Sequence, residues 1–181
     1  MPCLRNDLFL FPNIIIMKKI LLLVAVLATV TGFGQNAKSP HDTVSMKDVS
    51  VTYGRPYKKG RVVFGELEKF GKVWRLGADQ ATTITFNKNT KFGTADIPAG
   101  TYTMCALLNE NEWTIILNSV LGQWGAFSYD KNKDKDVASV TVPVKKMDAT
   151  VEQLTIRFEK NKLMIIEWAE TQVTVPVKPK D

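Results

Sequence analysis

Cysteine and histidine are almost missing from this chain of 181 residues, which contains two cysteines and one histidine, His41. Zinc sites are usually built from several Cys and His ligands, so these numbers argue against a zinc centre. A Ser-His-Asp hydrolase would have to use His41, and the Gly-x-Ser-x-Gly turn that presents the serine of many such enzymes is missing from the sequence. We therefore expect no metal and no cofactor.

The scarcity of cysteine also excludes a disulfide framework. Cys3 lies in a segment that we expect to be removed, so Cys105 alone remains in the mature chain. Cys105 falls in the strand-like run 101–108, where a thiol usually behaves as a small buried hydrophobe. Its neighbours offer no cation to activate it, and we predict a core residue rather than a nucleophile.

A strong excess of one charge is missing as well. The chain has 24 Lys and Arg against 18 Asp and Glu, a net charge of +6. Segment 1–34 contains three basic residues and one acidic residue, so its removal would lower the net charge to +4. The lysines are scattered among acidic residues, so we expect no nucleic-acid partner.

One acidic run resembles a calcium loop only in part. Asp130, Asn132, Asp134 and Asp136 alternate with lysines. However, Lys135 stands where the loop requires glycine and Thr141 where it requires glutamate. We expect a solvated turn there.

Long apolar runs are missing too, since a transmembrane helix takes about 20 apolar residues. The longest run, 20–30, follows Lys18 and Lys19 and ends before Gly32-Phe33-Gly34. This order of basic, apolar and small residues is typical of an export signal cleaved after Gly34.

The sequence therefore predicts a leader over 1–34 and a mature domain over 35–181, which is exported to the periplasm or secreted and has no stable membrane insertion. The signal itself spans 17–34. Residues 1–16 either precede the true start at Met17 or form a long charged region before the signal.

Short alternating runs of β-branched and aromatic residues dominate the rest of the chain, which is typical of half-buried strands. The runs are 49–53, 81–86, 101–108, 113–117, 137–144, 151–158, 163–168 and 172–177. Turn residues separate them at 87–89, 98–100, 109–111 and 159–162. We predict an all-β fold of eight or nine strands, a single antiparallel β-sandwich or jelly-roll-like domain, with one or two helical turns over 65–70.

The most heavily specified segment is 53–78, a long irregular stretch rich in Gly, Arg and Trp after the first long strand. Its arginines, Arg55, Arg61 and Arg75, carry planar forks that bind carboxylates or phosphates and stack on aromatic rings. Its glycines let the backbone approach a ligand closely. The arginines either contact a ligand or brace the segment through hydrogen bonds to carbonyl groups, and the sequence leaves both alternatives open.

Candidate ligand-binding residues lie in this segment or pair an amide with an indole ring further along the chain. They are Arg55, Arg61, Trp74, Arg75, Gln123 and Trp124, with Tyr53 and Glu167 as weaker candidates. A glycosidase would need two paired carboxylates. No pattern in the sequence indicates that two of its glutamates lie together, and a surface or salt-bridged role is favoured for Glu167. No catalytic residue is therefore assigned.

Ordered motifs along the chain point to one family. They are Tyr53-Gly54-Arg55-Pro56, Lys59-Gly60-Arg61 with Phe64-Gly65, Gly71-Lys72-Val73-Trp74-Arg75-Leu76-Gly77-Ala78, Ala81-Thr82-Thr83, Pro98-Ala99-Gly100-Thr101-Tyr102, Glu112-Trp113-Thr114 and Gln123-Trp124-Gly125. Over 39–177 the chain resembles the secreted bacterial family called domain of unknown function 2911. The resemblance implies an exported, single-domain protein of Gram-negative bacteria and supplies no activity, substrate or catalytic residue.

We expect a periplasmic β-sandwich binding module for a small or extended polar ligand, either carbohydrate-like or anionic. Its partner would be a small molecule or a glycan. Two alternatives stay open: a hydrolase-type enzyme that uses carboxylates, and an envelope protein–protein interaction module. The sequence specifies neither the ligand nor the oligomeric state.

Overall fold

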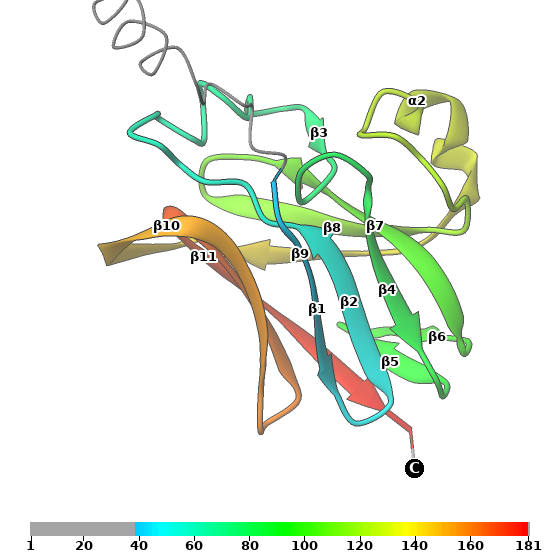
Figure 1. Ribbon diagram of the computed structural model, residues 1–181. Coiled ribbons are helices and arrows are strands. Elements are labelled where there is room, and N and C mark those ends of the chain that lie inside the picture. The colour runs from blue at the N-terminus through cyan, green and yellow to red at the C-terminus, as the bar shows by residue number, and fades with distance from the viewer. Residues whose placement is uncertain (1–38, 181) are drawn as a thin grey trace, which may run out of the picture. The chain divides into compact units, whose positions relative to one another are not determined.

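The computed structural model describes residues 39–180, which form two antiparallel β-sheets (Figure 1). The expected leader over 1–34 lies outside these residues. The larger sheet has the strand order β1-β2-β4-β7-β8-β9, with β3 also paired to β7. Its strands are β1 (His41–Met46), β2 (Val49–Gly54), β3 (Val73–Trp74), β4 (Thr82–Phe86), β7 (Gly100–Leu108), β8 (Glu112–Asn118) and β9 (Asp136–Pro143).

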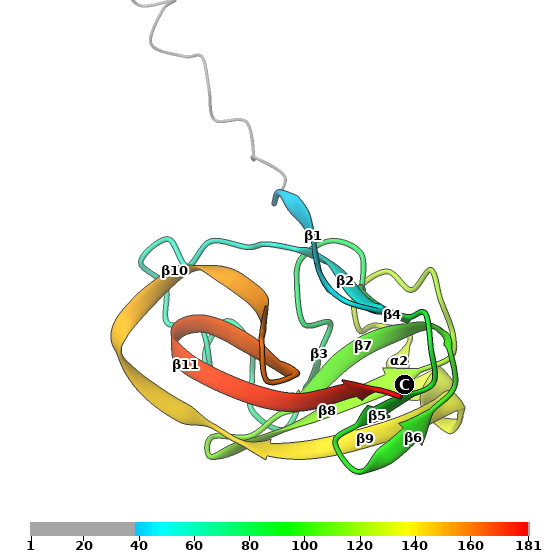
Figure 2. The same ribbon diagram turned by 90° about the horizontal axis from the view of Figure 1, so that it is seen from below.

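The smaller sheet has the order β10-β11-β5-β6. Its strands are β5 (Thr90–Phe92), β6 (Ala95–Ile97), β10 (Lys145–Glu159) and β11 (Leu163–Pro179). The long β10–β11 hairpin curls across the larger sheet, and β11 runs alongside β9 (Figure 2). The predicted all-β sandwich is therefore confirmed. Within residues 39–180, no helix is long and apolar enough to cross a membrane.

Alternation along each strand builds the core between the sheets. In β4, Ile84 and Phe86 are buried and face inward, and Val173, Val175 and Val177 of β11 come from the opposite sheet. Each such side chain contributes about 1.5–3 kcal/mol to the stability of the fold, because its apolar surface is removed from water.

The outer face of the larger sheet carries hydroxyl groups instead. Three pairs of threonines on neighbouring strands place their Oγ1 atoms 2.9 Å apart: Thr43 and Thr52, Thr85 and Thr101, Thr114 and Thr141. These cross-strand bonds reinforce the registers that the buried face sets.

The strand prediction was right about most positions and wrong about the count. The described residues contain eleven strands, because β1, β3, β5 and β6 were not expected. The runs 163–168 and 172–177 belong to one strand, β11, which continues past Ala169. Ala169 has a φ of +54° and pairs with Val151 where the β10–β11 register shifts, so a bulge bends the strand without ending it.

The helix prediction was wrong about its position. Residues 65–70 form turns, and the helical turns occur in α2 (Tyr129–Asn132) and η1 (Lys133–Lys135), where a solvated turn was expected. The backbone at 65–70 is held by two contacts with other parts of the same loop: Gly65 N–H donates to Glu68 O at 2.8 Å and Glu68 N–H donates to Val63 O at 2.8 Å. These bonds replace the helical pattern.

Residues 119–135 fold back over the outer face of the larger sheet. Met104 and Ala106 of β7 face the core. Because side chains alternate along a strand, their neighbours Thr103 and Cys105 point to the outer face. Both are nevertheless buried, and Thr103 Oγ1 donates to Val120 O at 2.7 Å. Burial, followed by the negative charge of Asp136, raises the pKa of the Cys105 thiol to about 12. This cover positions the loop that carries Gln123 and Trp124.

Candidate functional site

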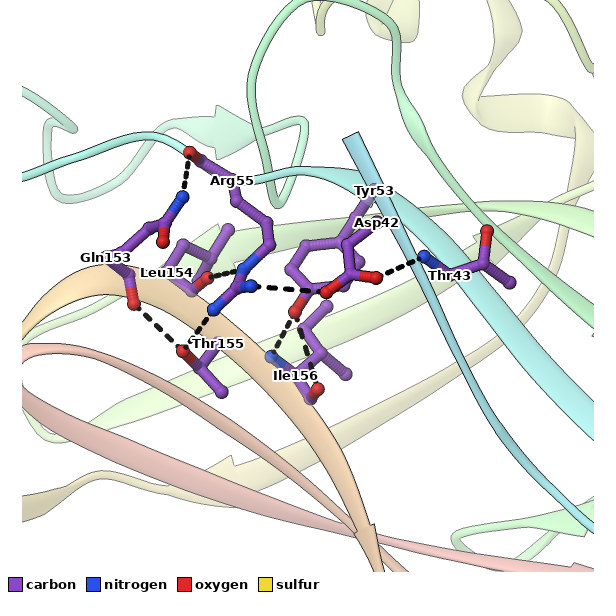
Figure 3. Close-up of polar contacts among 8 residues, drawn as sticks. All are labelled: Asp42, Thr43, Tyr53, Arg55, Gln153, Leu154, Thr155 and Ile156. Atoms are coloured by element: carbon purple, nitrogen blue, oxygen red, sulfur yellow. Dashed lines mark hydrogen bonds and ion pairs between the residues drawn. The ribbon is translucent and has the colours of Figure 1, made fainter. Parts of the chain in front are cut away.

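Arg55 extends from the end of β2 toward β10 and β1 (Figure 3). Its Nε donates to Leu154 O at 3.1 Å, Nη1 to Asp42 Oδ2 at 3.2 Å and Nη2 to Thr155 Oγ1 at 3.1 Å. All three guanidinium nitrogens therefore donate to protein groups. This geometry is that of a brace that joins the two sheets.

Tyr53 makes a second connection at the same place (Figure 3). Its ring is 2% exposed, and its hydroxyl accepts from Ile156 N–H at 2.8 Å and lies 3.4 Å from Ile156 O. Burial raises the pKa of the phenol, and the bond to Ile156 and the charge of Arg55 only partly oppose that effect. Tyr53 thus links β2 to β10 inside the sandwich.

Arg61 is exposed and contacts its own loop. Its Nε donates to Lys58 O at 2.9 Å, and Nη2 donates to Tyr57 O. These two bonds close the turn at residues 57–61.

Trp74 is inside the sandwich, at 3% exposure. Its ring stacks on Trp168 at 5.7 Å between centroids and meets the edges of Phe64 and Trp113, each at 5.9 Å. The indole N–H groups of Trp74 and Trp168 are buried and have no acceptor among the described residues. Packing is the visible role of Trp74.

Glu68 lies half-buried beside this aromatic cluster. Burial raises the pKa of its carboxyl to about 7, although the charges of Arg75 and Arg61 and the nearby indole N–H of Trp74 act in the opposite direction. A carboxyl with such a pKa is typical of functional sites. Nothing in the sequence distinguishes Glu68 from the other glutamates that a carboxylate pair could use, because it lies in a loop among other charged residues.

Arg75 differs from Arg55 in its free donors. The side chain is half-buried, and Nη1 donates to Asp79 O at 3.0 Å. Its Cζ lies 5.9 Å from the centroid of the Phe127 ring. Within residues 39–180, Nε and Nη2 have no acceptor, so two of the three guanidinium nitrogens keep donors that no protein group uses.

Gln123 holds the loop that carries Trp124. Its side chain is 8% exposed, and Nε2 donates to Val120 O at 3.0 Å and to Asn118 Oδ1 at 3.3 Å. Its Oε1 accepts from Ser128 Oγ at 3.0 Å. Gln123 is therefore a support inside the loop, whereas Trp124 is 57% exposed at the surface.

Three large apolar side chains of this loop reach solvent, and one of them, Phe127, lies beside Arg75. Leu121 is 50% exposed, Trp124 57% and Phe127 83%. The loop borders an open hollow of about 430 Å³. We refer to Arg75, Leu121, Trp124 and Phe127 as the aromatic platform. Sequence reasoning missed Phe127 and Leu121, because exposed apolar residues cannot be told from buried ones by pattern in a loop.

The structure thus separates the sequence candidates into two groups. Gln123 and Trp124 lie beside the segment that follows Arg75, since Gln80 pairs with Trp124 and Ala81 N–H donates to Gln123 O at 3.1 Å. Arg75 itself meets the same loop at Phe127. Arg55 and Tyr53 lie at the β2–β10 contact, and Arg61 closes a separate turn. Ligand contact stays a prediction for all of them, and the geometry favours the first group.

Glu167 is in an ion pair. Both of its carboxylate oxygens accept from Arg157, at 3.0 and 3.3 Å, and Gln172 adds a further bond. Burial tends to raise its pKa, but these bonds and the Arg157 charge outweigh that effect and lower it. Glu167 is therefore held ionised, which suits a structural role.

A narrower cavity of about 220 Å³ lies between the 58–70 loop and the bulge of β11. Phe64 and Trp113 line it, and Lys58 and Glu170 face each other at its rim, 3.7 Å apart. A hydrogen bond from Thr150 lowers the pKa of Glu170, so this carboxyl is poorly suited to donate a proton. Across residues 39–180, no three His, Cys, Asp or Glu side chains gather as a metal site requires.

The fold and these surfaces define the molecule as an antiparallel β-sandwich with an aromatic platform on a braced loop. The chain belongs to the family described as protein of unknown function (DUF2911), whose sequence profile matches residues 35–177. The family resemblance seen in the sequence motifs is thereby confirmed. Comparisons with curated proteins and with solved structures gave no match.

Proposed function

We propose that the protein is an exported binding module that holds a carbohydrate-like ligand on the aromatic platform. The observation that carries the proposal is the exposure of Trp124 and Phe127 on a loop whose base is a buried hydrogen-bond network. Exposed rings of this size in one patch mark binding surfaces more often than they occur by accident. The apolar face of a sugar ring is a natural partner for them.

Preorganisation supports the same proposal. The Gln123 bonds and the Asn118 bond to Val120 N–H at 2.9 Å hold the loop before any ligand arrives. A platform held in this way loses little conformational entropy on binding. The buried Gln123 side chain thus serves to hold the surface loop in place.

Arg75 supplies the polar part of the platform. Its Nε and Nη2 donors can pair with ligand hydroxyl or carboxylate oxygens, while Nη1 is held by Asp79 O. Gly125 allows this arrangement, because a Cβ at that position would stand 3.2 Å from Arg75 Nη1. Arginine beside aromatic rings suits a polar, ring-shaped ligand.

The alternatives use other features of the molecule. A hydrolase that uses carboxylates would start from Glu68, whose pKa of about 7 is suited to a general acid. Such a hydrolase needs a second carboxylate beside the first. The charged groups that act on Glu68 are the cations Arg75 and Arg61, so neither can serve as that partner. An envelope interaction module would use the platform to dock a protein.

A glycan array with the purified protein tests the proposal directly. We expect selective binding that Trp124→Ala weakens by about tenfold or more, since truncating an exposed binding aromatic removes its stacking contact. Arg75→Lys should weaken binding by about 1.5–3 kcal/mol, because charge remains but the planar fork is lost. Both variants should keep the melting temperature.

Phe70→Ala is the matched control, because Phe70 is an aromatic residue with 41% exposure outside the platform. It should bind as the unchanged protein does. An array without selective binding, or equal binding by Trp124→Ala, would overturn the proposal. Capture of a protein partner by the platform, again lost in Trp124→Ala, would favour the interaction module instead.

A further inference from the structure

Five lysines line one hollow of about 230 Å³, at the end of the sandwich where the β1–β2 turn, the β10–β11 turn and the end of β11 meet (Figure 1). They are Lys47, Lys88, Lys160, Lys162 and Lys180. The acidic residues of the same lining are Asp48 and Glu159. The hollow therefore carries an excess of positive charge.

The two acids are already engaged. Asp48 Oδ2 lies 3.8 Å from Lys88 Nζ, and Glu159 Oε1 accepts from Arg157 Nη1 at 2.7 Å. Lys180 Nζ also lies 3.1 Å from Oδ1 of Asp96, which is outside the lining. Among the residues that the structure describes, the other three lysines, Lys47, Lys160 and Lys162, have no acidic partner within ion-pair distance. Their charges are balanced by nothing in the hollow, and the potential there favours an anion.

The backbone fixes this arrangement. Val177 N–H donates to Lys162 O at 2.9 Å, and Lys180 N–H donates to Asn89 O at 2.8 Å, so three chain segments are joined at the hollow. Lys162 has a φ of +63°, a left-handed conformation that is unfavourable for a non-glycine residue. Lysine at such a position keeps a cation on the rim where glycine would be easier to accommodate.

We propose that this hollow binds a phosphate-type oxyanion. Lysine ammonium groups act as point charges toward phosphate oxygens, and several turns present them from different directions. The oxyanion could come from a free phosphate ester or from the headgroup of a phospholipid. The site is separate from the aromatic platform and does not depend on the function proposed for it.

Titration of the purified protein with inorganic pyrophosphate, followed by calorimetry, tests the site. The double variant Lys47→Gln/Lys160→Gln should bind about tenfold more weakly, as expected for two partly exposed charged contacts. Lys69→Gln/Lys133→Gln is the matched control, because it removes the same charge from exposed lysines outside the hollow. It should bind as the unchanged protein does.

Sedimentation with vesicles distinguishes the two sources. Binding to phosphatidylglycerol vesicles but not to phosphatidylcholine vesicles, competed by pyrophosphate, assigns the oxyanion to a lipid headgroup. Binding of pyrophosphate without vesicle binding assigns it to a free ester. The proposal is overturned if neither probe binds, or if the control variant loses as much affinity as the variant in the hollow, since the effect would then follow net charge alone.

Discussion

The free donors of each arginine decide what that residue can do. Arg55 has all three guanidinium nitrogens bonded within the protein, whereas Arg75 keeps Nε and Nη2 without an acceptor in the described part of the chain. Both lie in the same glycine-rich segment and both have aromatic neighbours in the sequence. Arg55 donates to Asp42, Leu154 and Thr155, which only folding brings near. Arg75 donates to Asp79, four residues along the chain.

Arg55→Lys should therefore destabilise the domain. The substitution keeps the charge but removes two of the three directed bonds, and we expect the free energy of unfolding to fall by about 2 kcal/mol. Urea denaturation measures this change. Arg61→Lys is the control and should change stability by less than about 0.5 kcal/mol, because Arg61 is exposed and braces only its own turn. Equal effects of the two variants would contradict the bracing role.

Glu68 should make stability depend on pH. Because its pKa in the folded protein, about 7, lies above the value of 4.5 for a free side chain, protonation stabilises the folded state. This contribution is fully present below the unfolded pKa and is lost as the pH rises through 7.

Glu68→Gln should remove that dependence. Compared with the unchanged protein, the variant should gain about 2 kcal/mol of stability near pH 8 and almost nothing near pH 4. Melting temperatures measured across this range check the prediction. A constant difference between the two proteins at all pH values would show that Glu68 does not titrate as described.

Among the elements, those set by local alternation were predictable and those set by distant contacts were not. The strands β7 and β8 were found close to their observed limits, because their own residues alternate and turn residues bound them. The continuity of β11 through Ala169 depends on pairing with Val151, which no local pattern reveals. The aromatic platform depends on the folding of 119–128 over the sheet, so only two of its four members, Arg75 and Trp124, were candidates from the sequence.

The end of β2 shows how close packing fixes an element. A Cβ on Gly54 would stand 2.2 Å from Ala78 O, and backbone cannot move away as a side chain can. We expect Gly54→Ala to cost about 3 kcal/mol or more. Gly60→Ala is the comparison, since its φ is +70° and nothing lies within 4 Å; it should cost about 1 kcal/mol. Thermal unfolding of both variants tests the difference.

For the whole molecule, the two proposed binding regions lie at different ends of one sandwich. The platform accompanies α2, and the lysine hollow lies at the β1–β2 and β10–β11 turns (Figure 1). Variants in one region should leave binding at the other unchanged, because sites that share no partners act independently. The two proposals can therefore be tested separately.

Export is a prediction about the whole chain, and it rests on residues that the structure does not describe. Cleavage after Gly34 should give a mature protein that begins at Gln35. Intact-mass spectrometry of the protein isolated from the periplasm or the medium measures this directly. A mature chain that retains Phe33, or anything before it, would contradict the cleavage site.

The burial of Cys105 beneath residues 119–135 makes the reactivity of its thiol a measure of how often the loop opens. With a pKa of about 12 and 4% exposure, the thiol should hardly react with an alkylating reagent while the loop is in place. Alkylation should then proceed only in the moments when the loop lifts from the sheet, so its rate reports how often that happens. A ligand bound at Trp124 would slow the alkylation of Cys105. The alkylation rate would then report occupancy of the platform without a labelled ligand and without knowledge of what the ligand is.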